Sequence, residues 1–171
     1  PWKKYFINLS GTLVENLVDG YGLKNCFCFK GLDVSKELYS IIDFAKKMNY
    51  KKIGLAFCVG LAKEANITTK LLEKHGFEVE SIICKVGSIN REEIGINGCN
   101  VPMCNPIGQA MFLNEKKTDF NVLLGLCVGH DTLFFKYSEA PVTVFAVKDR
   151  VLAHNPLGAI YQVDSYYKNK L

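Results

Sequence analysis

Two nearly identical short segments constrain the fold of this chain more than any other feature. Residues 57–61 read Phe-Cys-Val-Gly-Leu, and residues 126–130 read Leu-Cys-Val-Gly-His. Each segment follows an apolar run of strand character and passes through a glycine into a run with helical spacing. A cysteine that closes a strand just before a helix begins occupies a position where side chains commonly do chemistry. We therefore expect the functional site at these two turns.

The rest of the chain repeats this alternation of strand and helix. Strands are expected at residues 52–58, 77–84, 120–127 and 142–147. Helices are expected at residues 33–49, 61–75, 106–117, 131–137 and 155–167. The alternation indicates an α/β domain with a parallel sheet. We expect a three-layer sandwich of the Rossmann-like or flavodoxin-like kind, with about four strands in the order 2-1-3-4.

The length and punctuation of the chain indicate how it is organised. A chain of 171 residues suits one domain, and we expect a short N-terminal extension over residues 1–31 followed by a single α/β domain over residues 32–171. The extension contains Cys26 and Cys28. Residues 85–103 form a long connection with three glycines, and connections of this length are often functional.

Composition excludes several classes of protein. Hydrophobic residues make up 49% and charged residues 22%, which is typical of a globular protein and not of a disordered one. The net charge of +4 is spread over lysines that mostly stand beside acids, so we predict no nucleic-acid partner. No apolar run approaches the roughly 18 residues of a membrane span, and no secretory signal pattern is present. We therefore predict a cytoplasmic protein without a membrane partner, whose aromatic C-terminal segment leaves room for a homodimer face.

The seven cysteines provide the strongest functional signal. An odd number without a secretory signal argues against a disulfide framework. Three cysteines close expected strands, and a fourth precedes a helix that returns antiparallel to the sheet, so all four are expected at one edge: Cys58, Cys84, Cys127 and Cys104. Four thiolates are enough for tetrahedral zinc or for an iron–sulfur cluster, and this dispersed spacing does not choose between them. We predict a metal site at these four cysteines.

A reactive thiol is the alternative interpretation. Cys58 and Cys127 lie beside expected helix N-termini, which lower the pKa of a thiol. His130 follows Cys127 by three residues, and either His130 or His154 is expected to act as a base. This interpretation predicts an enzyme that acts on a small anionic substrate, with Cys127 and His130, or Cys58, as catalytic residues. A third alternative is a non-catalytic module that binds a small molecule or a partner.

Further residues are expected along the same edge. The amides after Gly60 and Gly129 open helices and suit a small anion. Lys85 directly follows Cys84, and His154 stands before an Asn-Pro pair as Cys104 does. We predict that these four residues contribute to binding. The charged run at residues 148–150 also reaches this edge, and we interpret it as solvated surface. The two turns lack the glycine patterns of dinucleotide-binding and P-loop proteins.

These segments together resemble a family of uncharacterised prokaryotic proteins known as DUF1847, which are described as predicted metal-binding proteins. The similar stretches span roughly residues 36–161 and are Ile53–Ala62, Cys84–Gly87, Met103–Ile107, Gly125–Asp131, Ala140–Thr143, Lys148–Leu152 and His154–Leu157. The resemblance implies that Cys58, Cys84, Cys104 and Cys127 belong to the family pattern. It also implies a cysteine-rich N-terminal segment, from which this chain departs because it has only two cysteines there. It brings no known reaction.

Overall fold

The structure is a computed structural model that describes residues 37–96 and 101–168. The chain divides into two compact units between residues 51 and 52, and each is described by itself. In the first unit, helix α3 (Glu37–Lys47) buries Ile41, Ile42 and Ala45. The predicted N-terminal extension, the predicted start of this helix at Asp33, and Cys99 lie outside the described residues.

The second unit is built on a parallel sheet of four strands. These are β1 (Lys52–Phe57), β2 (Glu78–Ile83), β3 (Phe120–Leu126) and β4 (Val142–Val147). Their order is β2-β1-β3-β4, and every neighbouring pair is parallel. The predicted fold class, strand direction and strand order are confirmed.

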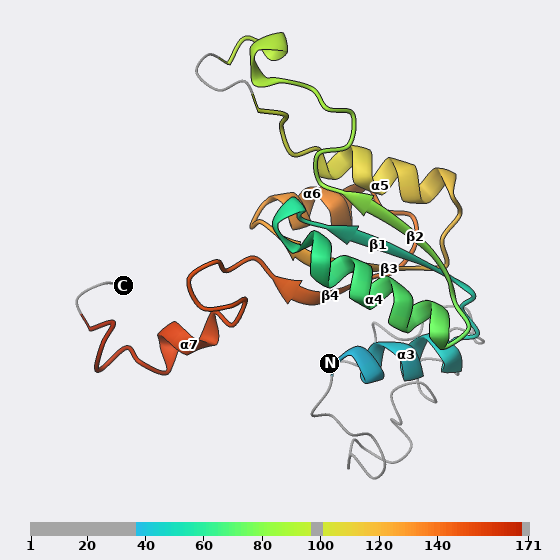
Figure 1. The fold of residues 1–171 in the computed structure, drawn as a ribbon, viewed down its shortest axis with the longest axis horizontal. Helices are drawn as coiled ribbons and strands as arrows, with labels where there is room; N and C mark the ends of the chain where they lie inside the picture. The colour runs from blue at the N-terminus through green and yellow to red at the C-terminus, as the bar shows by residue number, and fades with distance from the viewer. Residues whose placement is uncertain (1–36, 97–100, 169–171) are drawn as a thin grey trace, which may run out of the picture. The chain divides into compact units, whose positions relative to one another are not determined.

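Helices cover both faces of this sheet (Figure 1). Helix α4 (Ala62–Lys74) packs on one face, while α5 (Pro106–Glu115) and α6 (His130–Tyr137) pack on the opposite face and against each other. The chain changes direction across the sheet after β2, as right-handed crossovers require for this strand order. The switch point therefore lies between β1 and β3, and the predicted three-layer arrangement is confirmed.

The two central strands owe their position to their apolar sequences. Every residue of β3 is buried, and so are the four middle residues of β1, whereas the outer strands are only partly buried. One polar side chain, Asn121, is fully buried in β3. It is satisfied by a hydrogen bond from the Thr118 hydroxyl at 2.7 Å and by its own donation to the Ser138 hydroxyl at 2.9 Å. Gly54 faces it, since a Cβ there would lie 2.0 Å from the Asn121 Oδ1.

The start of α5 follows from its sequence. The Asn105 side chain accepts a hydrogen bond from the Gly108 N–H at 2.8 Å, and Pro106 occupies the first turn, where its missing N–H costs nothing. In the connection before it, a short 3-10 helix (η3, Arg91–Ile94) begins with a capping box between Asn90 and Glu93. The predicted long connection therefore contains local structure.

The expected C-terminal helix is wrong in length. In place of a helix over residues 155–167, only α7 (Leu157–Ile160) forms, and turns continue to residue 168. The exposed fractions of Tyr161 and Tyr166 are 72% and 65%. Short helices draw most of their stability from a buried face, and this segment has no buried residue in α7. No described helix is both long enough and apolar enough to cross a membrane.

Candidate functional site

Each strand of the sheet is followed at once by a side chain that can do chemistry. Cys58 follows β1, Cys84 follows β2, Cys127 follows β3 and Lys148 follows β4. Because the four strands are parallel, all four residues lie at the carboxyl edge, where ligands bind in open α/β sheets.

Cys58 is paired with the lysine that follows β4, the outer strand two positions from β1 in the sheet. The Lys148 Nζ lies 2.8 Å from the Cys58 Sγ, and the Gly60 N–H also donates to this sulfur. A Cβ at Gly60 would come within 3.3 Å of the Lys148 Nζ, so a glycine leaves room for this contact. Burial of the Cys58 thiol raises its pKa, but Lys148 and the Gly60 amide outweigh burial, and the net pKa of Cys58 is lowered.

The environment of Cys84 shifts the pKa of its thiol in the opposite direction. Its Sγ accepts a hydrogen bond from the Val59 N–H at 3.3 Å and lies 3.8 Å from the Cys104 Sγ. Burial is the largest cause that raises the pKa of Cys84, to about 11, and the neighbouring Cys104 and Cys58 add to it. The surroundings of Cys58 and Cys84 therefore shift the pKa values of these two thiols in opposite directions.

Cys104 reaches this edge because the chain turns back before α5. The Asn105 N–H donates to the Cys84 carbonyl oxygen at 2.7 Å, which fixes the segment beside the end of β2. Cys58 and Cys84 belong to one buried cluster, and Cys104 packs against it. Cys58, Cys84 and Cys104 are called the thiol row below.

The fourth predicted thiol does not join this row. Among the hydrogen bonds of the described residues, none involves the Cys127 Sγ, and Cys127 is outside the buried cluster that holds Cys58 and Cys84. Its carbonyl oxygen accepts from the His130 N–H at 2.9 Å, so backbone atoms hold this turn. Among the described residues, the structure therefore shows contacts that link three of the four predicted cysteines, and no hydrogen bond links the side chain of Cys127 or His130 to them.

The thiol row meets only part of what a metal site needs. Adjacent ligands of tetrahedral zinc lie roughly 3.8 Å apart when the Zn–S bonds are about 2.3 Å, and the Cys84–Cys104 separation of 3.8 Å matches this spacing. Cys58 is instead bonded to Lys148. Within residues 37–96 and 101–168, no group of three or more His, Cys, Asp or Glu side chains is arranged to hold a metal ion. The row as it stands offers two ligand positions.

Most of the other predicted binding residues stabilise the loops near them in the structure. The Lys85 Nζ donates to the Pro102 carbonyl oxygen, which braces the long connection. The His154 Nδ1 accepts from the Asp149 N–H at 3.1 Å. Gly129 has a φ of 87°, which favours glycine, and a Cβ there would meet no atom within 4 Å. Of the four predicted binding residues, Gly60 is the one that contacts the Cys58 sulfur.

Two contributors were missed by sequence reasoning. Lys148 belongs to the charged run interpreted as solvated surface, but it is half-buried and bonded to Cys58. Its position directly after a strand, like that of the cysteines, is the signal that identifies it. Gln109 is fully buried in α5, and its Nε2 donates to the carbonyl oxygens of Phe57 at 3.3 Å and Ile82 at 2.9 Å. It therefore ties the ends of β1 and β2 together beside the cysteines.

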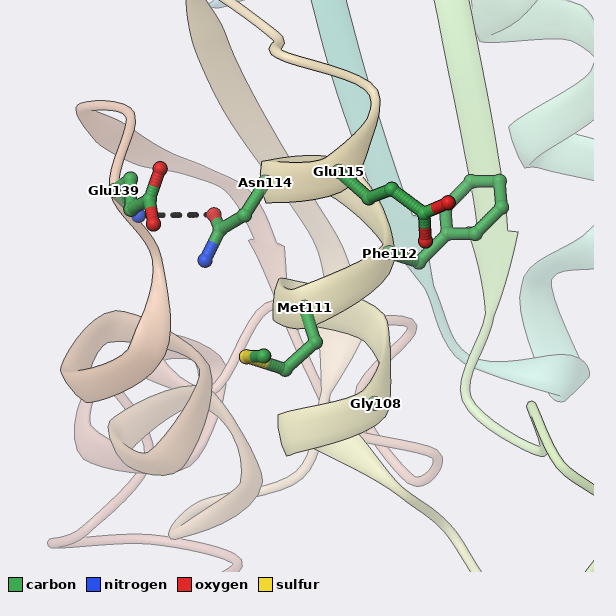
Figure 2. Close-up of a pocket in the computed structure, with 6 residues that line it drawn as sticks. All are labelled: Gly108, Met111, Phe112, Asn114, Glu115 and Glu139. Atoms are coloured by element: carbon green, nitrogen blue, oxygen red, sulfur yellow. Dashed lines mark hydrogen bonds between the residues drawn. The ribbon is translucent and has the colours of Figure 1, made fainter.

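A separate groove of about 600 Å³ runs along α5 (Figure 2). It is lined by Gly108, Met111, Phe112, Asn114, Glu115 and Glu139. The Asn114 side chain accepts a hydrogen bond from the Glu139 N–H at 3.0 Å, as Figure 2 shows. None of the cysteines that the structure describes lines this groove, so it is distinct from the carboxyl-edge site.

Comparison with known proteins found a matching family and a similar relative. The model of the family DUF1847, described as a protein family of unknown function, matches residues 27–145. An uncharacterised protein of Methanocaldococcus jannaschii is 56% identical over 138 residues, a stretch that covers 78% of this chain and 70% of the relative. The matched family region contains all of the thiol row but ends before Lys148.

Proposed function

The chain belongs to the DUF1847 family, and we propose that it is a thiol-dependent enzyme whose nucleophile is the Cys58 thiolate. The observation that carries this proposal is the 2.8 Å contact between the Lys148 Nζ and the Cys58 Sγ. The thiolate and not the thiol is the nucleophile in cysteine chemistry. An ammonium group in contact with the sulfur favours the thiolate, as activated cysteines require.

The position of this pair also supports an active site. Cys58 follows β1, one of the two strands that flank the switch point of the sheet. Sequence reasoning paired the reactive thiol with His130, whereas the structure provides Lys148 as the partner of Cys58. A lysine stabilises the anion through its charge and does not need to remove a proton during the reaction.

The substrate is a small molecule with negative charge. Cys58 is only 5% exposed, which admits a small reagent more readily than a macromolecule. When the sulfur forms a covalent bond it loses its charge, and the Lys148 ammonium is then left to pair with an anionic group of the substrate. This agrees with the anionic substrate expected from the sequence.

A second candidate function is the binding of zinc or an iron–sulfur centre. The 3.8 Å separation of the Cys84 and Cys104 sulfurs favours it, because it suits two ligands of one tetrahedral metal. Further ligands would have to come from Cys58, after it separates from Lys148, or from Cys127. Thiolates bound to the metal would give the site its affinity.

The two candidates are separated by alkylation and by metal analysis of the full chain. Limiting iodoacetamide at neutral pH should modify Cys58 first, as peptide mass spectrometry would show. First modification of another cysteine, or equal modification of all, would contradict the enzyme proposal. Zinc or iron bound to anaerobically purified protein, and lost in both Cys84→Ser and Cys104→Ser, would support the metal site instead.

A further inference from the structure

The thiol row combines one sulfur that contacts a lysine ammonium group with two further thiols. Cys58 contacts Lys148, and Cys84 lies 3.8 Å from Cys104. Cys84 and Cys58 belong to one buried cluster, and the N–H of Val59, the residue after Cys58, donates to the Cys84 Sγ at 3.3 Å, so the central thiol lies beside both of its neighbours. A disulfide requires a sulfur separation of about 2.0 Å, so rotation of side chains at the end of the strands would be needed to join either pair.

We propose that the thiol row passes a disulfide from Cys58 through Cys84 to Cys104, and that the oxidising substrate is a small anionic disulfide. This inference rests on the proposed function, since Cys58 must first react as the nucleophile. It assigns a substrate class to the site and a role to two cysteines that the nucleophile alone does not explain.

The first step is attack on the substrate. The Cys58 thiolate attacks one sulfur of the substrate disulfide, the substrate S–S bond breaks, and one substrate thiolate leaves. A mixed disulfide now joins Cys58 to the other half of the substrate. Because the Cys58 sulfur is no longer charged, Lys148 is released from it and can stabilise the next thiolate that forms.

Two internal exchanges complete the transfer. Cys84 loses its proton to solvent and attacks the Cys58 sulfur, which forms a Cys58–Cys84 disulfide and expels the second substrate thiolate. Cys104 then loses its proton and attacks the Cys84 sulfur, which forms a Cys84–Cys104 disulfide and returns Cys58 to its thiolate state. In total, one substrate disulfide is reduced to two thiolates while two protein thiols are oxidised to one disulfide.

The environments of the three sulfurs give this sequence its direction. In thiol–disulfide exchange, the sulfur best stabilised as a thiolate is the best leaving group. Cys58 has the contact with Lys148, so the final exchange releases the sulfur with the best-stabilised charge. Cys104 is more exposed than Cys84, which leaves the final disulfide open to an external reductant.

The test uses dithiobis(nitrobenzoate), an anionic aromatic disulfide whose released thiolate is coloured. One equivalent is added to the reduced full-length protein, and the products are located by non-reducing peptide mass spectrometry. The wild type should release two coloured thiolates per reagent molecule and accumulate the Cys84–Cys104 disulfide. Cys104→Ser should stop at a Cys58–Cys84 disulfide, and Cys84→Ser should stop at a mixed disulfide on Cys58 with one thiolate released.

The outcomes distinguish failure of the disulfide transfer along the thiol row from failure of Cys58 as the nucleophile. A persistent mixed disulfide on Cys58 in the wild type would overturn the disulfide transfer along the thiol row while leaving Cys58 as the nucleophile. A Cys58→Ser variant that releases the first thiolate as fast as the wild type would overturn both. Cys99→Ser controls for the loss of one thiol, and the wild-type peptide map decides the matter even if a row variant does not fold.

Discussion

Replacement of Lys148 by methionine should slow the alkylation of Cys58 at neutral pH by about tenfold or more. The substitution keeps an unbranched side chain but removes the ammonium group that lies 2.8 Å from the Cys58 Sγ. Two unit charges at this distance attract by about 1.5 kcal/mol even at the dielectric constant of bulk water. About 1.4 kcal/mol corresponds to a tenfold change in the thiolate population, and partial burial of the pair increases the effect.

The assay is the pH profile of iodoacetamide alkylation, followed at Cys58 by peptide mass spectrometry. Lys148 lowers the pKa of Cys58, so its removal should move the profile toward alkaline pH without changing the rate at the alkaline plateau. Lys148→Arg keeps the charge and should retain most of the neutral-pH rate. Lys70→Met, which removes an exposed lysine on α4, is the matched control. Equal rates for Lys148→Met and wild type at neutral pH would refute the electrostatic activation.

Three further predictions concern the surroundings of the site. Gly54→Ala should lower the unfolding free energy by about 1–3 kcal/mol in chemical denaturation, because its Cβ would lie 2.0 Å from the buried Asn121 Oδ1; an unchanged value would contradict this packing. Because the pKa of Cys84 is raised from 9.0 to about 11, its unfolded thiol ionises first, so stability should fall as pH rises from 9.0 toward 11, and Cys84→Ala should lessen that fall in thermal unfolding. Gln109→Met removes the bonds that join the ends of β1 and β2 and should cost about 1–2 kcal/mol of unfolding free energy, unless the two strand ends hold their spacing without them.

The sheet and its order follow from the sequence because the signals there are local and repeated. The apolar runs that become β1 and β3 are buried along most of their length, and glycine or Asn-Pro signals mark the ends of the helices between strands. Parallel direction and short crossovers then leave few strand orders. The C-terminal helix was overestimated because its N-terminal signal at Asn155-Pro156 is local, whereas its extent depends on a buried face that the sequence does not reveal.

The candidate site was predictable in position but not in its partners. That Cys58 and Cys84 lie at the carboxyl edge follows from the ends of their strands, and the return of Cys104 follows from the antiparallel run of α5. The contact between Lys148 and Cys58 joins residues 90 positions apart in the chain, and no local pattern specifies it. Membership of the buried cluster, which Cys58 and Cys84 have and Cys127 lacks, depends on side-chain positions in the folded state, which spacing along the chain does not determine.

The proposed function requires that Lys148 lowers the pKa of Cys58 below the ordinary thiol value. The measurement is the difference in thiolate ultraviolet absorbance between wild type and Cys58→Ser as the pH is raised, with Lys148→Met titrated alongside. We predict that one thiolate per chain forms below the ordinary thiol value of 9.0 in the wild type, is absent in Cys58→Ser, and forms at higher pH in Lys148→Met. If the wild type and Cys58→Ser instead differ only when the pH reaches the ordinary thiol value of 9.0, the Lys148–Cys58 pair does not activate this thiol.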